Sequence, residues 1–160
     1  MNADNIIIFT DLDGSLLNHD DFQFKKIRSF IIDCLNCGIK IIPNSSKTKR
    51  EIEVFSDQLG KQLPFIVENG AAVHNLDLLN VNLKSNTNSI IFSRTIDEII
   101  EIFKKKVPVI FKDKCLFIKD MKKQKQKEIL GLNDDYLPFA LNRGYSIPFI
   151  FNGSPELVDE

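Results

Sequence analysis

Residues 6–17 read Ile-Ile-Ile-Phe-Thr-Asp-Leu-Asp-Gly-Ser-Leu-Leu, and this stretch determines how the rest of the chain is interpreted. Its short apolar run, rich in β-branched side chains, predicts a strand buried on both faces, as in a parallel sheet. Asp11 and Asp13 follow at the carboxyl end of that strand, where open α/β sheets place their ligands. Carboxylates so close to a buried strand are costly unless they bind a cation or take part in a reaction. An acidic turn without function is the alternative, but the strand before it and Gly14 after it favour a functional site.

Length and composition limit the class of protein. The 160 residues allow one ordinary domain, or one domain and part of another. An apolar content of 43% and a charged content of 27% are typical of a soluble globular protein. The net charge of −1 argues against nucleic-acid binding driven by overall charge, and no apolar run is long enough to span a bilayer. Because the N-terminus also lacks the features of a signal peptide, we expect a cytoplasmic protein with neither a nucleic-acid nor a membrane partner.

Strand and helix patterns alternate through the first half of the chain. Apolar residues at helical spacing end at Gly38, a second strand covers residues 39–42, and a second amphipathic helix ends at Gly60. A third strand covers residues 63–67 and leads into a turn at residues 68–70. This order predicts an α/β fold with a parallel sheet whose strands end at the same edge.

A polar cluster follows the second predicted strand. Ser45 and Ser46 lie at the expected N-terminus of the next helix, where free N–H groups and the helix dipole favour an anion such as phosphate. Lys47 adds a cation beside them. The cluster could instead be an ordinary helix cap with a solvated lysine. Its expected position beside the two aspartates favours a phosphate site.

The composition changes after about residue 82. We therefore expect two domains, an N-terminal part of an α/β core over residues 1–82 and a partial α+β module over residues 83–160. In the module, residues 90–92 look like a strand.

Three further patterns predict the structure of the module. Thr95 and Glu98 predict a capping box at the start of a helix. Residues 107–111 and 115–118 suggest a hairpin. The lysine-rich run at residues 122–127 lacks interleaved aromatic side chains, so it indicates the exposed face of a short helix rather than a nucleic-acid surface.

Four stretches of this sequence resemble one enzyme family. Residues 6–17 resemble the first motif of the haloacid dehalogenase-like phosphatases. Residues 45–52, 64–72 and 143–149 are similar to the mannosyl-3-phosphoglycerate phosphatase branch of that family. The resemblance implies a partial Rossmann-like parallel sheet followed by part of an α+β cap domain. It also implies a Mg²⁺-dependent phosphatase that hydrolyses a phosphorylated sugar glycerate through an aspartyl-phosphate.

The resemblance further implies a role for each matching residue. Asp11 would attack the phosphoryl group, and Asp13 would act as acid and then base. The Asp11 carboxylate and the Asp13 backbone carbonyl would hold Mg²⁺, while the Ser45 hydroxyl would bind a phosphoryl oxygen. The other substrate-binding residues implied by the resemblance are Ser46, Lys47, Asn69, Gly70, Arg143 and Ser146. Arg143 and Ser146 would come from the cap, where a cation suits the carboxylate of a sugar glycerate.

This sequence also departs from the family pattern. Ile147 stands where the family usually has Glu, and Ser45 stands where it usually has Thr. No stretch matches the catalytic lysine and the second acidic motif that family members place beyond the cap. We therefore expect a homologue truncated within the cap domain, with weak magnesium binding and poor or no turnover, unless a separate polypeptide supplies the C-terminal half. Such a chain would expose a sheet edge and apolar helix faces.

Two other functions remain open on the sequence alone. A phosphatase for a simpler sugar phosphate would show no preference for substrates that carry a glycerate carboxylate. A catalytically impaired binding module would keep a compact first half without turnover.

Overall fold

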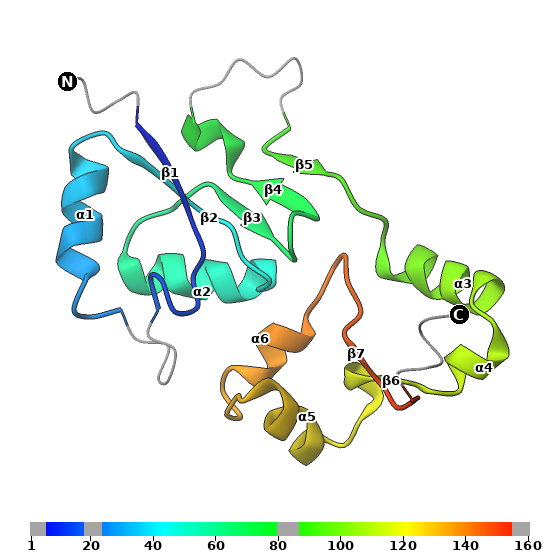
Figure 1. Ribbon diagram of the computed structural model, residues 1–160. Helices are drawn as coiled ribbons and strands as arrows, with labels where there is room; N and C mark the ends of the chain where they lie inside the picture. The colour runs from blue at the N-terminus through cyan, green and yellow to red at the C-terminus, as the bar shows by residue number, and fades with distance from the viewer. Residues whose placement is uncertain (1–5, 18–23, 80–86, 155–160) are drawn as a thin grey trace. The chain divides into compact units, whose positions relative to one another are not determined.

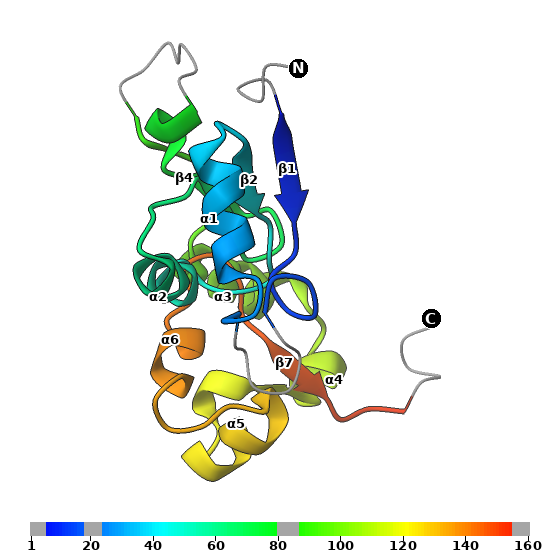
Figure 2. The ribbon, with the colours of Figure 1, turned by 90° about the vertical axis from the view of Figure 1, so that its left-hand side faces the viewer.

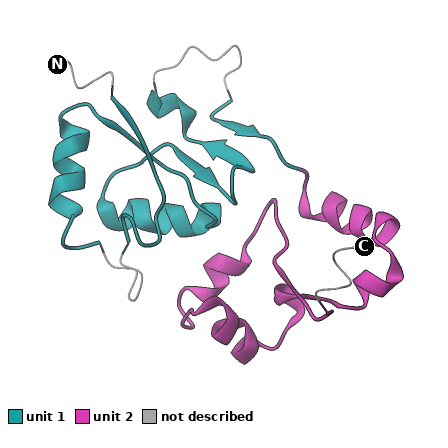
Figure 3. Cartoon of the chain, in the orientation of Figure 1, with its two compact units in different colours: residues 1–93 teal, residues 94–160 magenta. Residues whose placement is uncertain are grey.

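The computed structural model describes residues 6–17, 24–79 and 87–154. The chain divides into two compact units, residues 1–93 and residues 94–160, which Figure 3 shows in teal and magenta. Each unit has its own strands and helices. Within the described ranges, no helix combines the length and the apolar character needed to cross a membrane.

The first unit alternates strands and helices (Figure 1). Its elements in chain order are β1 (Ile7–Thr10), α1 (Arg28–Asn36), β2 (Lys40–Pro43), α2 (Lys49–Leu59), β3 (Phe65–Val67), β4 (Ala72–His74), the 3-10 helix η2 (Leu76–Leu79) and β5 (Ser89–Ile91). Helix α2 ends as predicted at Gly60, which adopts a left-handed φ of 76°. The predicted alternation from the first to the third strand is therefore confirmed.

The strands of the first unit place several loops at one edge. β1 and β2 pair in parallel, with Thr10 opposite Pro43. β3, β4 and β5 form an antiparallel sheet in that order. An isolated parallel bridge between Asn44 and Ile66 joins the end of β2 to β3. The carboxyl ends of β1, β2 and β3 consequently point the same way.

The core of the first unit lies between its helices and strands. α1 lies beside β2 (Figure 2), and α2 contacts β3. Buried apolar side chains of these four elements form this core: Ile31, Ile41, Ile42, Ile52, Phe55, Leu59, Phe65 and Val67. Burial of each such side chain contributes about 1.5–3 kcal/mol relative to exposure.

The predicted burial of β1 on both faces is wrong. Ile7, Ile8 and Phe9 are 53%, 40% and 62% exposed. Among the described residues β1 pairs only with β2, so its second edge has no hydrogen-bonded neighbour and its faces stay uncovered. The exposed sheet edge that we expected is present, and Phe30 on α1 (69% exposed) adds to the exposed apolar surface.

The boundary between the units also differs from the expected one. The first unit extends to Ser93 rather than to residue 82. The reason is that β5 pairs with β4, where Ser89 lies opposite His74. The strand expected near residues 90–92 is therefore the last strand of the first unit's sheet.

The second unit is a small α+β unit. Its elements are α3 (Ile96–Lys106), α4 (Val109–Lys112), β6 (Cys115–Phe117), the 3-10 helix η3 (Ile118–Asp120), α5 (Lys123–Leu130), α6 (Leu137–Leu141) and β7 (Phe149–Phe151). The predicted capping box is confirmed, because Thr95 and Glu98 bond reciprocally at the start of α3. The lysine-rich helix is also confirmed as α5, which ends at Gly131.

The predicted hairpin in the second unit is wrong. β6 pairs with β7 in antiparallel orientation, with Leu116 opposite Ile150. Most of the segment expected to form the other strand is helix α4. Pro108 explains the difference, because it has no amide N–H to donate to a strand ladder. Its carbonyl instead accepts the N–H groups of Phe111 and Lys112, both at 3.1 Å, which closes a helical turn.

Candidate active site

Asp11 is held at the carboxyl end of β1 by hydrogen bonds to its neighbours. The Leu12 amide donates to Asp11 Oδ1 at 2.7 Å, and Thr10 Oγ1 donates to the Asp11 carbonyl at 2.9 Å. The Leu12 side chain is fully buried, which anchors this turn to the core. Gly14 takes a φ of 72° and donates its amide to the Leu17 carbonyl at 2.9 Å. The chain therefore turns back sharply while the Asp11 carboxylate stays at the strand end.

Asn44 occupies the matching position on β2. Its amide donates to the Thr10 carbonyl at 2.8 Å, one step beyond the pairing of Thr10 with Pro43. Asp11 and Asn44 consequently leave the sheet side by side. Sequence reasoning missed Asn44, although its place directly after the second strand was a usable signal, because side chains at that point reach the ligand edge of a parallel sheet.

Backbone hydrogen bonds join the loop after β2 to the turn after β3. The Ser45 amide donates to the Ile66 carbonyl at 3.2 Å, and the Asn69 amide donates to the Ser45 carbonyl at 3.1 Å. Glu68, Asn69 and Gly70 all adopt left-handed backbone conformations, with φ of 48°, 61° and 91°. This run of positive φ is uncommon for residues other than glycine. It turns Asn69 and Gly70 towards the loop that carries Ser45.

These segments enclose one polar cavity in the first unit. The cavity measures about 390 Å³ and is lined by Asp11, Asn44, Ser45, Ser46, Asn69 and Gly70. The structure thus brings five of the predicted site residues together. Hydroxyl, amide and backbone N–H groups can donate hydrogen bonds to phosphoryl oxygens, and Asp11 supplies a carboxylate that can act as a nucleophile.

The prediction that Ser45 and Ser46 lie at the N-terminus of a helix is wrong. α2 starts at Lys49, and Thr48 is its N-cap. The Thr48 hydroxyl accepts the Glu51 amide at 3.2 Å, and Glu51 Oε2 accepts the Thr48 amide at 2.8 Å. The capping box therefore belongs to Thr48, and Ser45 Oγ instead accepts the Lys47 amide at 3.3 Å in the preceding loop.

Asp13 and Lys47 form an ion pair beside the cavity rather than among its lining residues. Lys47 Nζ lies 3.1 Å from Asp13 Oδ1 and 3.6 Å from Glu51 Oε1. The side chains of Lys47 and Glu51 are only 13% and 10% exposed. Asp13 Oδ1 is buried and has no hydrogen bond of good geometry from the described residues, so Lys47 is its close electrostatic partner there. Glu51 is a further member of this cluster that sequence reasoning did not place here.

The residues present fit a magnesium ion that keeps several non-protein ligands. No three His, Cys, Asp or Glu side chains gather into a metal site in the described part of the chain. Magnesium, however, is commonly held by one or two carboxylates together with water and substrate phosphate oxygens. Asp11 faces the polar cavity and its neighbour Asp13 carries a buried carboxylate oxygen. The oxygen atoms of these two aspartates suit a magnesium site in which the protein supplies only one or two carboxylates.

Arg143 and Ser146 lie in the second unit. Arg143 Nε donates to Ser146 Oγ at 2.7 Å, and both residues line a separate small cavity of that unit. The structure therefore brings these two predicted residues together with each other.

Comparison with known proteins identifies the family. Residues 8–140 match the haloacid dehalogenase-like hydrolase family. A glucosyl-3-phosphoglycerate/mannosyl-3-phosphoglycerate phosphatase from Persephonella marina is 35% identical to this chain, over 96% of this chain and 58% of the relative. A mannosyl-3-phosphoglycerate phosphatase from Pyrococcus furiosus is 37% identical over 42% of this chain and 27% of its own length.

The solved structures agree with this family at the level of the fold. A haloacid dehalogenase-like hydrolase from Bacteroides thetaiotaomicron aligns with a TM-score of 0.54 at 14% identity, over 89% of this chain and 55% of that one. The chain thus spans little more than half the length of these relatives. Because the family match covers most of the sequence, including both aspartates and the polar cavity, the chain belongs to the haloacid dehalogenase-like hydrolase family.

Proposed function

We propose that this chain carries the phosphoryl-transfer site of a Mg²⁺-dependent phosphatase that acts on a phosphorylated sugar glycerate through an aspartyl-phosphate. The observation that carries the proposal is the polar cavity in which Asp11 meets Ser45, Ser46, Asn69 and Gly70. The names of the relatives from Persephonella marina and Pyrococcus furiosus support mannosyl-3-phosphoglycerate, or a close relative of it, as the substrate.

Each described side chain has a role in this reaction. The Asp11 carboxylate attacks phosphorus, and the bond between phosphorus and the sugar-glycerate oxygen breaks. Asp13 gives a proton to the departing oxygen and later takes one from the water that hydrolyses the aspartyl-phosphate. Ser45, Ser46, Asn69 and the backbone at Gly70 hold the phosphoryl oxygens. Bound Mg²⁺ would offset the negative charge on those oxygens.

Lys47 has a positioning role in the proposal. Its ammonium group lies 3.1 Å from Asp13 and 3.6 Å from Glu51, and Glu51 is itself fixed by the capping box of α2. Asp13 is therefore tethered through Lys47 to the start of α2.

Arg143 and Ser146, in the second unit, take a polar group of the substrate other than the phosphate.

The proposal is tested by phosphate release from mannosyl-3-phosphoglycerate and glucosyl-3-phosphoglycerate in the presence of Mg²⁺. We expect Asp11→Asn to reduce release to background because the amide is a poor nucleophile. Asp57→Asn is the matched control, since Asp57 lies on the exposed side of α2 away from the cavity. Release that persists in Asp11→Asn would contradict the proposal, as would equal rates on a sugar phosphate that has no glycerate carboxylate.

We also propose that full activity needs a further polypeptide segment that covers β1. The strand exposes Ile7, Ile8 and Phe9, and the chain matches only 58% of the length of the Persephonella marina relative. Exposed consecutive apolar residues on an unpaired strand edge favour pairing with another strand. The test is to add the part of that relative that this chain does not match. Phosphate release should rise in wild type but not in Asp11→Asn, and no rise in wild type would refute this second proposal.

A further inference from the structure

Asn44 lines the polar cavity of the first unit, but the reaction proposed above gives it no role. Its backbone N–H is already used, because it donates to the Thr10 carbonyl at 2.8 Å. Its carboxamide, in contrast, forms no hydrogen bond with any residue that the structure describes. Asn44 therefore brings two unused N–H donors to the cavity that contains Asp11.

The backbone around Asn44 is held firmly at the end of β2. Pro43 before it is fully buried, and Ser45 after it is only 3% exposed. An isolated parallel bridge pairs Asn44 with Ile66, on the side away from β1. Asn44 itself is exposed, so its side chain leaves the sheet between two buried neighbours. A donor on such a fixed backbone is preorganised, and binding a ligand needs little further ordering.

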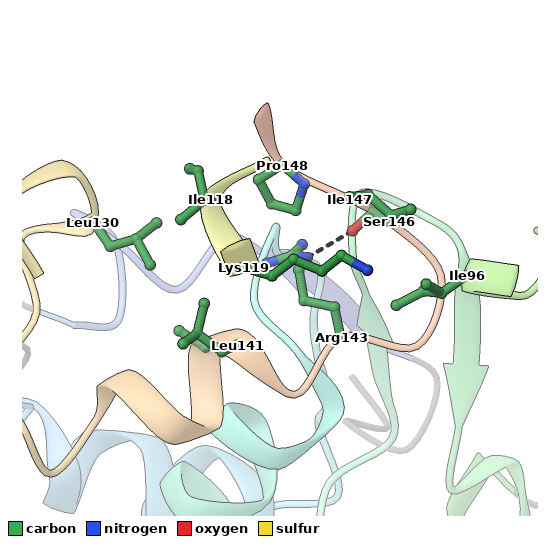
Figure 4. A pocket seen from close by; sticks show the side chains of 10 residues that line it. Ile96, Ile118, Lys119, Leu130, Leu141, Arg143, Ser146, Ile147 and Pro148 are labelled. Atoms are coloured by element: carbon green, nitrogen blue, oxygen red, sulfur yellow. Dashed lines mark hydrogen bonds between the residues drawn. The ribbon is translucent and has the colours of Figure 1, made fainter. Parts of the chain in front are cut away.

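The cavity contains no cationic side chain from the described part of the chain. Lys47 pairs instead with Asp13 at 3.1 Å and with Glu51 at 3.6 Å. In the second unit, Lys119 extends beside Arg143 in a separate and largely apolar cavity of about 40 Å³ (Figure 4). A phosphoryl group in the first unit's cavity consequently depends on neutral groups of this unit for its hydrogen bonds, and each such donor matters more.

The surroundings of Asn44 favour a donating N–H group over a metal-binding oxygen. A carboxamide can offer either one, and neighbouring charges select its orientation. Asp11 and Asn44 are neighbours across the sheet, one step beyond the pairing of Thr10 with Pro43. The Asp11 carboxylate and a bound phosphoryl group are both acceptors, so they attract the N–H side of the amide and repel its oxygen.

We propose that Asn44 is a further catalytic residue, whose carboxamide donates a hydrogen bond to an oxygen of the phosphoryl group held at Asp11. The identification of the ligand as a substrate's phosphoryl group rests on the proposed function. Because Asn44 and Asp11 extend from neighbouring strands, this bond orients the phosphorus atom towards the attacking carboxylate. The same donor remains in contact with the phosphoryl group after its transfer to Asp11.

Titration of the 160-residue chain with inorganic phosphate in the presence of MgCl₂, followed by calorimetry, tests the proposal. Asn44→Ala should weaken the phosphate affinity about tenfold or more, which corresponds to the loss of one hydrogen bond to a charged group. Asn44→Gln keeps the donor on a longer side chain and should retain part of this affinity. Circular dichroism checks that each variant is folded.

Asn44→Asp distinguishes a donor from a metal ligand. It preserves the shape of the side chain and supplies oxygens that Mg²⁺ prefers, but it removes both N–H groups. We expect it to weaken phosphate binding more than Asn44→Ala does, whereas a metal ligand at this position would bind phosphate more tightly as aspartate.

Asn36→Asp is the matched control for the added charge. Asn36 is exposed at the end of α1 and precedes β2, whereas Asn44 follows the other end of that strand. Asn36 does not line the cavity, so Asn36→Asp should leave phosphate binding unchanged.

Several outcomes would overturn the proposal. They are no phosphate binding by wild type, unchanged affinity in Asn44→Ala, tighter binding in Asn44→Asp, or equal losses in Asn44→Asp and Asn36→Asp. Hydrolysis of mannosyl-3-phosphoglycerate at the wild-type rate by Asn44→Ala would also overturn it and leave the phosphatase proposal intact. Phosphate binding that depends on Asn44, in a chain that hydrolyses no sugar glycerate phosphate, would support the role of Asn44 and reject the phosphatase proposal.

Discussion

At the scale of single residues, Lys47 joins two carboxylates that would otherwise repel each other. Its ammonium group lies between Asp13 and Glu51, and little of the Lys47 or Glu51 side chain is exposed. The sequence placed Lys47 among substrate-binding residues. In the structure Lys47 contacts one of the two proposed catalytic aspartates, and it is not among the residues that line the polar cavity.

We predict that Lys47→Met lowers the free energy of unfolding by about 1–3 kcal/mol, because it leaves the buried Oδ1 atom of Asp13 and the Glu51 carboxylate, which is 10% exposed, without a counter-charge. The matched control is Lys49→Met. Lys49 is 54% exposed and pairs with Glu53 at 3.7 Å, so its loss should cost less than about 0.5 kcal/mol. Urea denaturation measures both. Equal effects of the two substitutions would show that the Lys47 contacts are no stronger than surface pairs.

At Gly70 the energetic effect of backbone conformation can be separated from that of side-chain contacts. It has a φ of 91°, and a Cβ atom added there would meet nothing within 4 Å. We predict that Gly70→Ala costs about 1 kcal/mol of stability through backbone strain alone. It should also weaken the binding of inorganic phosphate measured by calorimetry, because the turn that lines the cavity shifts.

Gly131→Ala is the control for this prediction. Gly131 is also left-handed (φ 65°) with open space around its Cβ position, but it ends α5 in the second unit. Its replacement should cost similar stability and leave phosphate binding unchanged. Weaker phosphate binding in Gly131→Ala would argue that any loss of stability, rather than the cavity, lowers the affinity.

At the scale of elements, a buried histidine lies within the antiparallel sheet of the first unit. His74 on β4 is 4% exposed, and its Nδ1 lies 2.7 Å from the Ser89 hydroxyl on β5. Its Nε2 is buried without a hydrogen-bond partner in the described part of the chain. Burial lowers the pKa of His74 below its usual 6.5, and the charge of Lys49 lowers this pKa further, while Glu53 acts in the opposite direction.

The lowered pKa predicts that acid destabilises the first unit. Below about pH 6.5 an unfolded His74 takes up a proton that the folded one resists, so the unfolded state binds more protons. The His74 contribution to stability is therefore present above pH 6.5 and is lost as the pH falls from there towards the lowered pKa of the folded state. Urea midpoints at pH 7.5 and pH 5.5 measure this loss. His74→Gln should show a smaller difference between the two pH values, and an unchanged difference would rule out His74 as the cause.

At the scale of the whole molecule, exposed apolar side chains gather on β1. We predict that the chain self-associates through this edge at high concentration and that Phe9→Lys reduces the association, because charge on an edge strand opposes pairing. Light scattering as a function of protein concentration measures this self-association. Phe92→Lys is the matched control, since Phe92 is 69% exposed but follows β5. An equal reduction by both variants would point to general charge repulsion rather than to β1.

Many features of both units could be predicted because their signals are local. The glycine that ends α2, the capping box at Thr95 and the apolar spacing of the helices each depend on residues within one or two turns of each other. Asp11 and Ser45 were identified because they follow predicted strands, although the helix expected to start at Ser45 has Thr48 as its N-cap. The cavity confirms that these strand ends meet.

Other features depend on segments far apart in the sequence, and local patterns contain no information about them. Which strand pairs with β6 was mispredicted, because the apolar segment next to it contains Pro108 and the real partner lies some thirty residues later. The exposure of β1 was mispredicted because burial depends on which elements cover a strand. An apolar pattern shows only that the strand is compatible with burial on both faces.

The sequence by itself determined the alternating α/β pattern, the glycines that end α2 and α5, and the aspartates that begin the site, because each follows from the preferences of neighbouring residues. Only the tertiary structure decided that Asn44 lies beside Asp11, that Lys47 pairs with Asp13 and does not line the polar cavity, and that Lys119 lies beside Arg143. The physical reason is that strand register and side-chain packing bring distant residues together, and the energies that select one such arrangement are properties of the folded chain as a whole.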